Sequence, residues 1–165
     1  MLSLVKVFLC GCTALLCLTS IGCFPKPNGP RAAVIHYAIR LRPGQDLRRE
    51  IERFSKAREI KAGWIVGCVG SLTRLNLRLA NQPGPTERDG HFEIVSLVGT
   101  LSTSGVHLHL SASDERGLTL GGHLLEGNSV YTTAEIIIAE SKRLRFSRAR
   151  DGTTPWPELQ IAPAK

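Results

Sequence analysis

The hydrophobic and polar positions predict a strand followed by a helix where the folded region begins. In AAVIHYAIRL, residues 32–41, apolar and polar side chains alternate imperfectly, which is typical of a half-buried strand. A turn at residues 43–44 leads to Asp46, a good helix N-cap, and apolar residues then recur at helical spacing to about Ile60. We therefore expect one amphipathic helix after the first strand.

A glycine-punctuated apolar run begins at Gly63 and gives way at Ser71 to strict alternation. The alternation sets Leu72, Arg74, Asn76 and Arg78 on one face of a strand. Two consecutive strands, or one long bent strand, fit this pattern best. Residues 81–90, NQPGPTERDG, then form a polar loop.

The second half of the chain is nearly all strand. The candidates, separated by Gly-bearing turns, are residues 92–102, 106–113, 118–125, 129–139 and 142–149. Residues 151–165 contain three Pro and are expected to form an irregular tail. One helix among seven or eight strands predicts an α+β fold with a mainly antiparallel sheet.

Composition and charge add only broad limits to this picture. A chain of 165 residues with 42% hydrophobic content is expected to form one compact domain with an aliphatic core. The 21 Lys and Arg exceed the 14 Asp and Glu, and the formal charge is +7. This balance favours acidic partners such as nucleic acid, anionic lipid or acidic small molecules.

Residues 1–23 differ from the rest of the chain. Lys6 precedes a long apolar run, and no further charged residue appears before Lys26. The pattern is typical of a signal peptide cleaved near Cys23, or of a membrane anchor. Residues 20–23 are also similar to a bacterial lipobox, in which the cysteine would carry lipid.

Cysteine usage supports treating this segment separately from the domain. Four of the five cysteines lie in it, which leaves Cys68 alone in the body of the chain and excludes an intradomain disulfide. Residues 24–31 follow as a Pro/Gly linker, and residues 32–150 form the domain. We expect a secreted or membrane-tethered protein, with a cytoplasmic or nuclear location as the alternative.

Three of the five histidines lie on two neighbouring strand candidates joined by a turn. His107 and His109 alternate with leucines, so both imidazoles share the polar face. Residues of a hairpin that share a face pair with an even sum of positions. A turn centred on Glu115 places His123 opposite His107, and a slip by two residues places it opposite His109; either register brings the three side chains together.

Such a cluster suits one cation, because metal–nitrogen bonds are about 2.0–2.1 Å and the rings supply the remaining reach. Zinc or another late divalent ion is expected, with water or a substrate group in the open position. Glu126 is a candidate second-shell partner or general base. The alternative is that the histidines are ordinary polar side chains of a half-exposed sheet, which is our interpretation of His36 and His91.

A basic cluster follows near the end of the domain: Lys142, Arg143, Arg145, Arg148 and Arg150. Lys and Arg placed along a groove are sufficient for nonspecific contacts with phosphates. Arg143 and Arg145 are expected on the exposed face of a last strand, with Leu144 and Phe146 packed inward. Solvation or subunit contacts are therefore the simpler interpretation of the cluster.

The histidine hairpin with its continuation, VHLHLSASDERGLTLGGHLLEGNSVYTTAEIII, resembles the plants-and-prokaryotes-conserved (PPC) domain. AGWIVGCVGSLTRLNLRLA and FEIVSLVGTLS are similar to segments of the same family, so the resemblance covers Val34 to Ala149. It implies a compact homotrimer in which His107, His109 and His123 hold a metal ion. Plant nuclear members also carry AT-hook segments with an Arg-Gly-Arg core for the minor groove. This chain has no such core, and a secreted chain meets no chromatin.

Three functional hypotheses follow from these observations. The first is a trimeric PPC module that binds a divalent metal, zinc foremost, or a small ligand, without established catalysis and with its ligand or protein partner open. The second is a DNA-associated regulatory protein that uses its basic surface. The third is a metal-assisted hydrolase in which Glu126 activates water beside the histidines.

Overall fold

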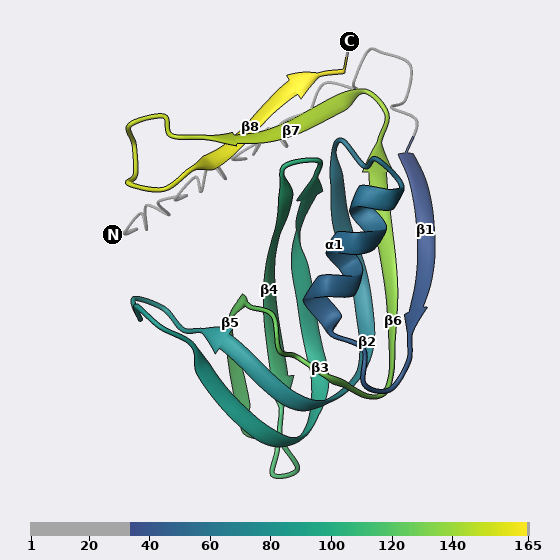
Figure 1. Ribbon diagram of the computed structural model, residues 1–165, viewed down its shortest axis with the longest axis vertical. Helices are drawn as coiled ribbons and strands as arrows, with labels where there is room; N and C mark the ends of the chain where they lie inside the picture. The colour runs from purple at the N-terminus through teal and green to yellow at the C-terminus, as the bar shows by residue number, and fades with distance from the viewer. Residues whose placement is uncertain (1–33, 165) are drawn as a thin grey trace, which may run out of the picture. The chain divides into compact units, whose positions relative to one another are not determined.

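The computed structural model describes residues 34–164, which contain one helix and eight strands (Figure 1). The elements are β1 (Val34–Leu41), α1 (Leu47–Ala57), β2 (Gly63–Arg78), β3 (Thr86–Ser102), β4 (Gly105–Ser113), β5 (Thr119–Leu124), β6 (Val130–Ser141), β7 (Leu144–Ala149) and β8 (Glu158–Pro163). The predicted α+β class with a mainly antiparallel sheet is confirmed. The expected signal or anchor segment, residues 1–23, and the linker, residues 24–31, lie outside the described residues.

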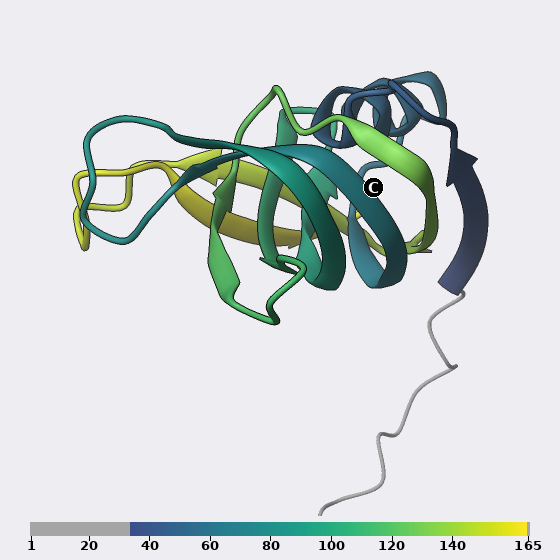
Figure 2. The same cartoon turned by 90° about the horizontal axis from the view of Figure 1, so that it is seen from below.

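Six strands form one antiparallel sheet in the order β1-β6-β2-β3-β4-β5. β2 is one long strand whose register shifts against both β3 and β6. Its last residues, Leu77 and Arg78, also pair with Leu124 and His123 of β5. The pairing of β5 with β2 therefore closes the strands β2, β3, β4 and β5 into a ring at this end, as Figure 2 shows from below.

Helix α1 begins at the predicted N-cap. The Asp46 carboxylate accepts a hydrogen bond from the backbone N–H of Arg49 at 2.8 Å, an interaction that stabilises a helix by ~1 kcal/mol. It also accepts one from the backbone N–H of Asn128 at 3.1 Å, so the cap holds the loop that follows β5. Leu47 and Ile51 are fully buried on the face of α1 that packs against β3 and β4.

The core between the helix and the sheet is aliphatic, as the composition predicts. Its largest fully buried apolar side chains are Leu47, Ile51, Ile60, Leu72, Leu75, Leu77, Leu101, Leu108, Leu124, Ile136 and Ile138. Leu72 lies in this core although the alternation placed it with Arg74. The register of β2 against β3 shifts between these two residues. Such an irregularity moves the side chains that follow it to the opposite face of the strand.

Two segments expected to lack regular structure form strands. The predicted loop at residues 81–90 is strand from Thr86 onward, and Glu87 of this extension forms an ion pair with Arg74 at 2.6 Å. The prediction was wrong here because a ladder exposed on both faces carries no hydrophobic alternation. The tail contains β8, which pairs with β7 from Glu158 to Pro163. Within residues 34–164, no helix is long and apolar enough to cross a membrane.

Candidate metal centre

The hairpin of β4 and β5 adopts the second of the two predicted registers. His109 lies directly opposite His123, with the turn centred one residue later than Glu115. The Asp114 carboxylate fixes this turn, since one of its oxygens accepts hydrogen bonds from the backbone N–H groups of Arg116 and Leu118, each at 2.9 Å. An aspartate that bonds to the backbone two residues ahead is a common way to close a tight turn.

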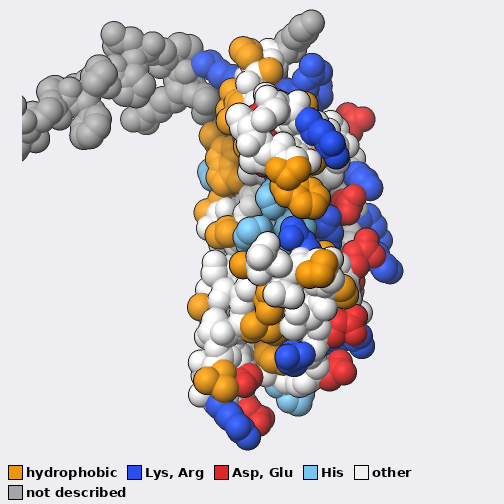
Figure 3. Space-filling view, turned by 90° about the vertical axis from the view of Figure 1, so that its left-hand side faces the viewer, with side chains coloured by type: hydrophobic (Ala, Val, Ile, Leu, Met, Phe, Trp, Pro, Cys, Tyr) orange, Lys and Arg blue, Asp and Glu red, His pale blue; other side chains and the backbone are white. Residues whose placement is uncertain are grey.

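The three histidine rings form one cluster. The centroid of the His107 ring lies 5.1 Å from that of His109 and 5.0 Å from that of His123, and the remaining pair is 5.6 Å apart. Each residue offers one nitrogen, and these nitrogens lie within 4.8 Å of one another. A tetrahedral ion with bonds of ~2.05 Å needs nitrogens ~3.4 Å apart, so small ring rotations would bring all three onto one ion. Figure 3 shows histidine side chains gathered on this face, next to Lys or Arg.

The environment keeps two of these histidines neutral. The pKa of His123 is lowered to about 4, chiefly by burial and next by the neighbouring His107. Burial and then the Arg148 guanidinium lower the pKa of His107. The buried Nδ1 of His123 has no hydrogen-bond partner among the described residues. A neutral imidazole with an unused lone pair is the form that binds a metal, so the residues fit the ion.

Gly99 of β3 sets the position of His107. Gly99 has φ +147°, and a Cβ on it would lie 2.0 Å from the carbonyl oxygen of His107. Only glycine therefore lets the two strands approach each other at this point. The same strand places Thr100 opposite His107.

Arg148 of β7 points toward the histidines instead of the solvent. Because side chains alternate along a strand, it shares one face of β7 with Phe146, which is buried as predicted, and with Leu144, which is half-buried. A guanidinium nitrogen of Arg148 lies 2.7 Å from Nδ1 of His107. A guanidinium has no acceptor, so Nδ1 of His107 accepts this hydrogen bond and the proton of the neutral ring lies on Nε2.

Lys142, Arg143 and Arg145 of the predicted basic cluster are placed differently from Arg148. Lys142 forms an ion pair with the buried carboxylate of Glu140 at 2.7 Å. Arg143 lies in the turn before β7, so its expected place on the strand was wrong, whereas Arg145 is exposed on the strand as predicted.

Glu126, the candidate second-shell partner, is bonded elsewhere. Its carboxylate forms an ion pair with Arg49 of α1 at 3.1 Å, and both side chains are more than half exposed. The metal-ligating group on this face consists of the three histidines alone. The structure therefore joins Glu126 to the helix and offers no contact between it and an imidazole.

Residues that the sequence analysis did not single out also line the site. A cavity of about 340 Å³ lies beside His107 and His123, and its walls include Arg78, Trp156 and Glu158. Arg78 is the cross-strand neighbour of His123. The sequence showed that Arg78 alternates with leucines. It did not show that β2 pairs with β5, because the paired residues lie some 45 positions apart and no local pattern marks the pairing.

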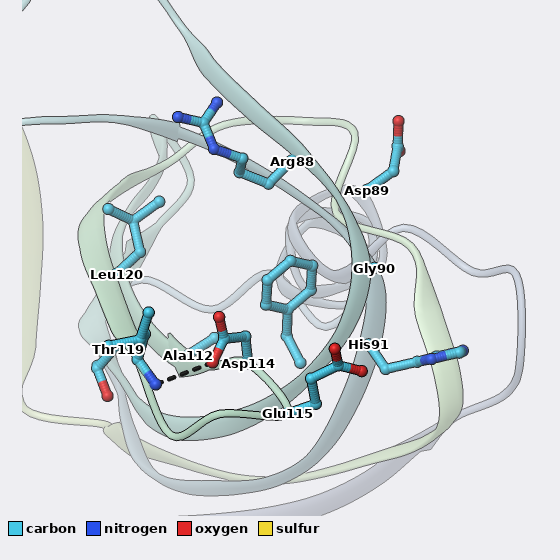
Figure 4. A pocket seen from close by; sticks show the side chains of 11 residues that line it. Arg88, Asp89, Gly90, His91, Ala112, Asp114, Glu115, Thr119 and Leu120 are labelled. Atoms are coloured by element: carbon cyan, nitrogen blue, oxygen red, sulfur yellow. Dashed lines mark hydrogen bonds between the residues drawn. The ribbon is translucent and has the colours of Figure 1, made fainter.

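A second cavity of about 450 Å³ lies away from the histidine cluster, between the first part of β3 and the β4–β5 turn (Figure 4). Arg88, His91, Asp114 and Glu115 are among the residues that line it. Although it is larger, it holds no group of three metal-ligating side chains within the described residues. The ring of His91 lies against Tyr131, with centroids 4.4 Å apart.

An antiparallel α+β domain with three histidines on one hairpin face is thus defined. Residues 30–142 match the Plants and Prokaryotes Conserved (PCC) domain, also written PPC. The chain belongs to this family, and the predicted resemblance is confirmed. β7 and β8 lie beyond the matched residues.

Among curated proteins, the chain is 47% identical to the bifunctional protein GlmU of a Synechococcus strain over 139 residues. These residues are 84% of this chain but 22% of that relative. It is also 25% identical over 136 residues to AT-hook motif nuclear-localized protein 13 of Arabidopsis thaliana, covering 73% of this chain and 31% of that one.

Among solved structures, a protein of Salmonella enterica is 42% identical, with a TM-score of 0.79, over 81% of this chain and 97% of that one. A protein of Archaeoglobus fulgidus described as metal-containing is 25% identical, with a TM-score of 0.67, over 78% and 96%. A candidate DNA-binding protein of Bacteroides thetaiotaomicron has a TM-score of 0.67 at 22% identity, over 76% and 91%, and therefore supports the fold alone.

Proposed function

We propose that this chain is a PPC-domain protein that binds a divalent metal ion, zinc foremost, through His107, His109 and His123. The observation that carries the proposal is the mutual placement of the three imidazoles, with nitrogens within 4.8 Å of one another. The unpartnered, buried Nδ1 of His123 supports it, because buried polar atoms are normally hydrogen-bonded. The metal-containing relative from Archaeoglobus fulgidus is consistent with it.

Zinc fits the donor set better than magnesium or calcium, because neutral imidazoles suit late transition ions whereas the harder ions prefer oxygen. Three protein ligands leave a fourth position for water or a ligand group. When bound, the ion would polarise such a group as a Lewis acid.

The test is metal analysis of protein purified without an affinity tag. We expect about one zinc per chain, and loss of that zinc in the double variant His107→Ala, His109→Ala. The matched control replaces His36 and His91, which lie outside the cluster, and should retain the metal. Wild-type protein that neither retains nor takes up stoichiometric zinc would contradict the proposal.

The assembly we propose is the homotrimer that the family resemblance implies. Exposed valines on β2 and β3 support a subunit contact, because Val66, Val69, Val95 and Val98 are 53–62% exposed. Monomeric proteins rarely leave such neighbouring apolar side chains uncovered. Sedimentation equilibrium should give three times the chain mass, and Val66→Glu with Val95→Glu should give a monomer.

The pattern of residues 1–23 supports a secreted or membrane-tethered location. N-terminal sequencing of the mature protein and its cellular fraction test this proposal. A start near residue 23 in an exported or membrane fraction is expected. A start at Met1 in a cytosolic or nuclear fraction would overturn it.

DNA association is a second candidate, favoured by the formal charge of +7 and by the likeness to an AT-hook nuclear protein of Arabidopsis. It predicts duplex binding that weakens steeply with salt. The engagement of Lys142 by Glu140 and of Arg148 by His107 leaves fewer basic groups for phosphates. Absence of a retarded complex with A·T-rich duplex at ~50 mM salt would remove this candidate.

A further inference from the structure

Arg148 and a metal ion would compete for the same histidine. While Arg148 donates to Nδ1 of His107 at 2.7 Å, the ring proton lies on Nε2 and neither nitrogen offers a free lone pair. Coordination of an ion by His107 through Nδ1 requires this hydrogen bond to break. The guanidinium keeps its hydrogen bonds to the backbone carbonyl of Pro157 and to the Thr100 hydroxyl, each at 3.3 Å, and the N–H that His107 releases is free to donate to a group next to the ion.

The charges around the cluster indicate what that acceptor is. Arg148 lies 2.7 Å from His107, Arg78 is the cross-strand neighbour of His123, and Arg48 donates to the backbone carbonyls of Val106 and Leu124 beside these two histidines. Glu158 is the acidic residue that lines the same cavity. A metal ion adds two further positive charges to this surface, so an anion is the complement that the site lacks.

The cavity beside the cluster has room for more than an oxyanion. Its volume is about 340 Å³, within the range of small-molecule sites, and both arginines of the strands, Arg78 and Arg148, line it. Val106, Trp156 and Pro157 supply an apolar wall. Trp156 is 67% exposed, so its ring is available to the apolar part of a ligand.

We propose that the β7–β8 hairpin completes a subsite for a small organic acid beside the histidines. Its carboxylate lies between Arg148, Arg78 and the open position of the metal, and its apolar body lies against Trp156. Planar carboxylates match the guanidinium fork, which favours this head group. The inference rests on the proposed metal site, and it assigns a binding role to a hairpin beyond the residues that match the family.

The test is calorimetric titration of zinc-loaded protein with benzoate, with benzamide as the neutral analogue of the same shape. We expect benzoate to bind and benzamide not to bind. Benzoate should also quench tryptophan fluorescence, and Trp156→Phe should abolish that quenching. Arg148→Gln and Arg78→Gln should each weaken benzoate binding by about 10- to 100-fold, the loss typical of a hydrogen bond to a charged group.

The matched control is Arg145→Gln, since Arg145 lies on the same strand and is exposed. It should leave benzoate binding unchanged. Arg148→Gln should bind zinc at least as tightly as wild type, because the competing donor is gone, whereas a purely structural role would lower the thermal midpoint and leave ligand selectivity unchanged.

Each failure has a separate meaning. Wild-type protein that takes up no zinc contradicts the proposed function. Zinc uptake with no benzoate binding, or with equal binding by benzamide or by Arg148→Gln, overturns the subsite alone. Inorganic phosphate binding more tightly than benzoate would also overturn it, since phosphate has no apolar body to contact Trp156.

Discussion

Two clusters of titratable side chains are partly buried in this domain, and they differ in whether their hydrogen bonds are complete. The Glu140 carboxylate is 1% exposed and accepts hydrogen bonds from the Tyr37 hydroxyl at 2.8 Å and from the Lys142 ammonium at 2.7 Å. In the histidine cluster, Nδ1 of His123 is buried without a partner among the described residues.

The charges differ in the same way. The Tyr37 hydroxyl donates to the Glu140 carboxylate, and the Lys142 ammonium gives it an opposite charge. The ionised form of Glu140 and the protonated forms of Tyr37 and Lys142 therefore favour one another. His107 and His123 lie beside arginines and beside one another, and burial, followed by these neighbours, lowers the pKa of both. The Glu140 cluster has its hydrogen bonds within the fold, whereas titratable groups with a shifted pKa and a buried nitrogen without a partner are typical of a functional site.

The largest expected effect is the loss of zinc affinity when a histidine of the cluster is replaced. His123→Ala should weaken zinc binding by more than ~100-fold, because loss of an outer-shell partner alone costs 10- to 100-fold and His123 is a direct ligand. The free energy of unfolding of the metal-free protein should change by only ~1 kcal/mol, since a half-buried side chain is lost. Zinc titration and denaturant unfolding measure the two quantities. Unchanged zinc affinity would make the cluster structural.

At the Glu140 cluster we expect the opposite result, a loss of stability with zinc affinity unchanged. Lys142→Ala leaves the buried Glu140 carboxylate with one neutral donor and should lower the free energy of unfolding by more than the loss of an exposed helix ion pair does. Zinc affinity should stay within a factor of about two. The control is Lys56→Ala, whose ion pair with Glu52 at 2.8 Å is on the helix surface and should be worth less than ~0.5 kcal/mol. Equal effects of the two changes would remove the contrast between the clusters.

The pH dependence of the metal-free protein sharpens the comparison. The pKa of His123 falls from 6.5 to about 4 on folding, so between these values the unfolded chain binds a proton that the folded chain does not. Stability should therefore decline as pH falls through 6.5 and the decline should level off near 4. Urea unfolding of the chelator-treated protein checks this. A His123→Asn variant with an equally steep profile would exclude His123 as the source.

The smallest effect is expected at Glu126. Its ion pair with Arg49 is exposed, so Glu126→Gln should change the free energy of unfolding by less than ~0.5 kcal/mol. Zinc affinity should be unchanged, because no imidazole contacts this carboxylate. A fall in zinc affinity of tenfold or more would restore Glu126 as a partner of the metal site.

The sequence predicted the parts of this fold that depend on local patterns. The Asp46 cap, the apolar face of α1 and the alternation of His107 and His109 each follow from side chains a few positions apart. The strand from Thr86 and the strand β8 were missed, because their polar or proline-bearing ladders form by pairing with a partner and not by a hydrophobic period. The shift after Leu72 was likewise invisible without the partner strand.

In the candidate site, too, the features set by local patterns were predicted and those set by distant contacts were not. Strand parity placed three histidines on one face, and the turn residues left two registers, of which Asp114 selects one. The position of Arg148 could not be predicted, because it depends on how the β7–β8 hairpin lies over the sheet. The sequence analysis therefore grouped Arg148 with the other basic residues, whereas in the structure it contacts His107.

X-ray absorption spectroscopy of zinc-loaded, untagged protein tests the central claim most directly. We predict a first shell with three imidazole nitrogens at about 2.0–2.1 Å and one light-atom ligand, and no sulfur. In the His107→Ala, His109→Ala variant this signature should disappear. A first shell with sulfur, with only one imidazole, or unchanged in the variant would contradict the assignment of His107, His109 and His123 as the metal ligands.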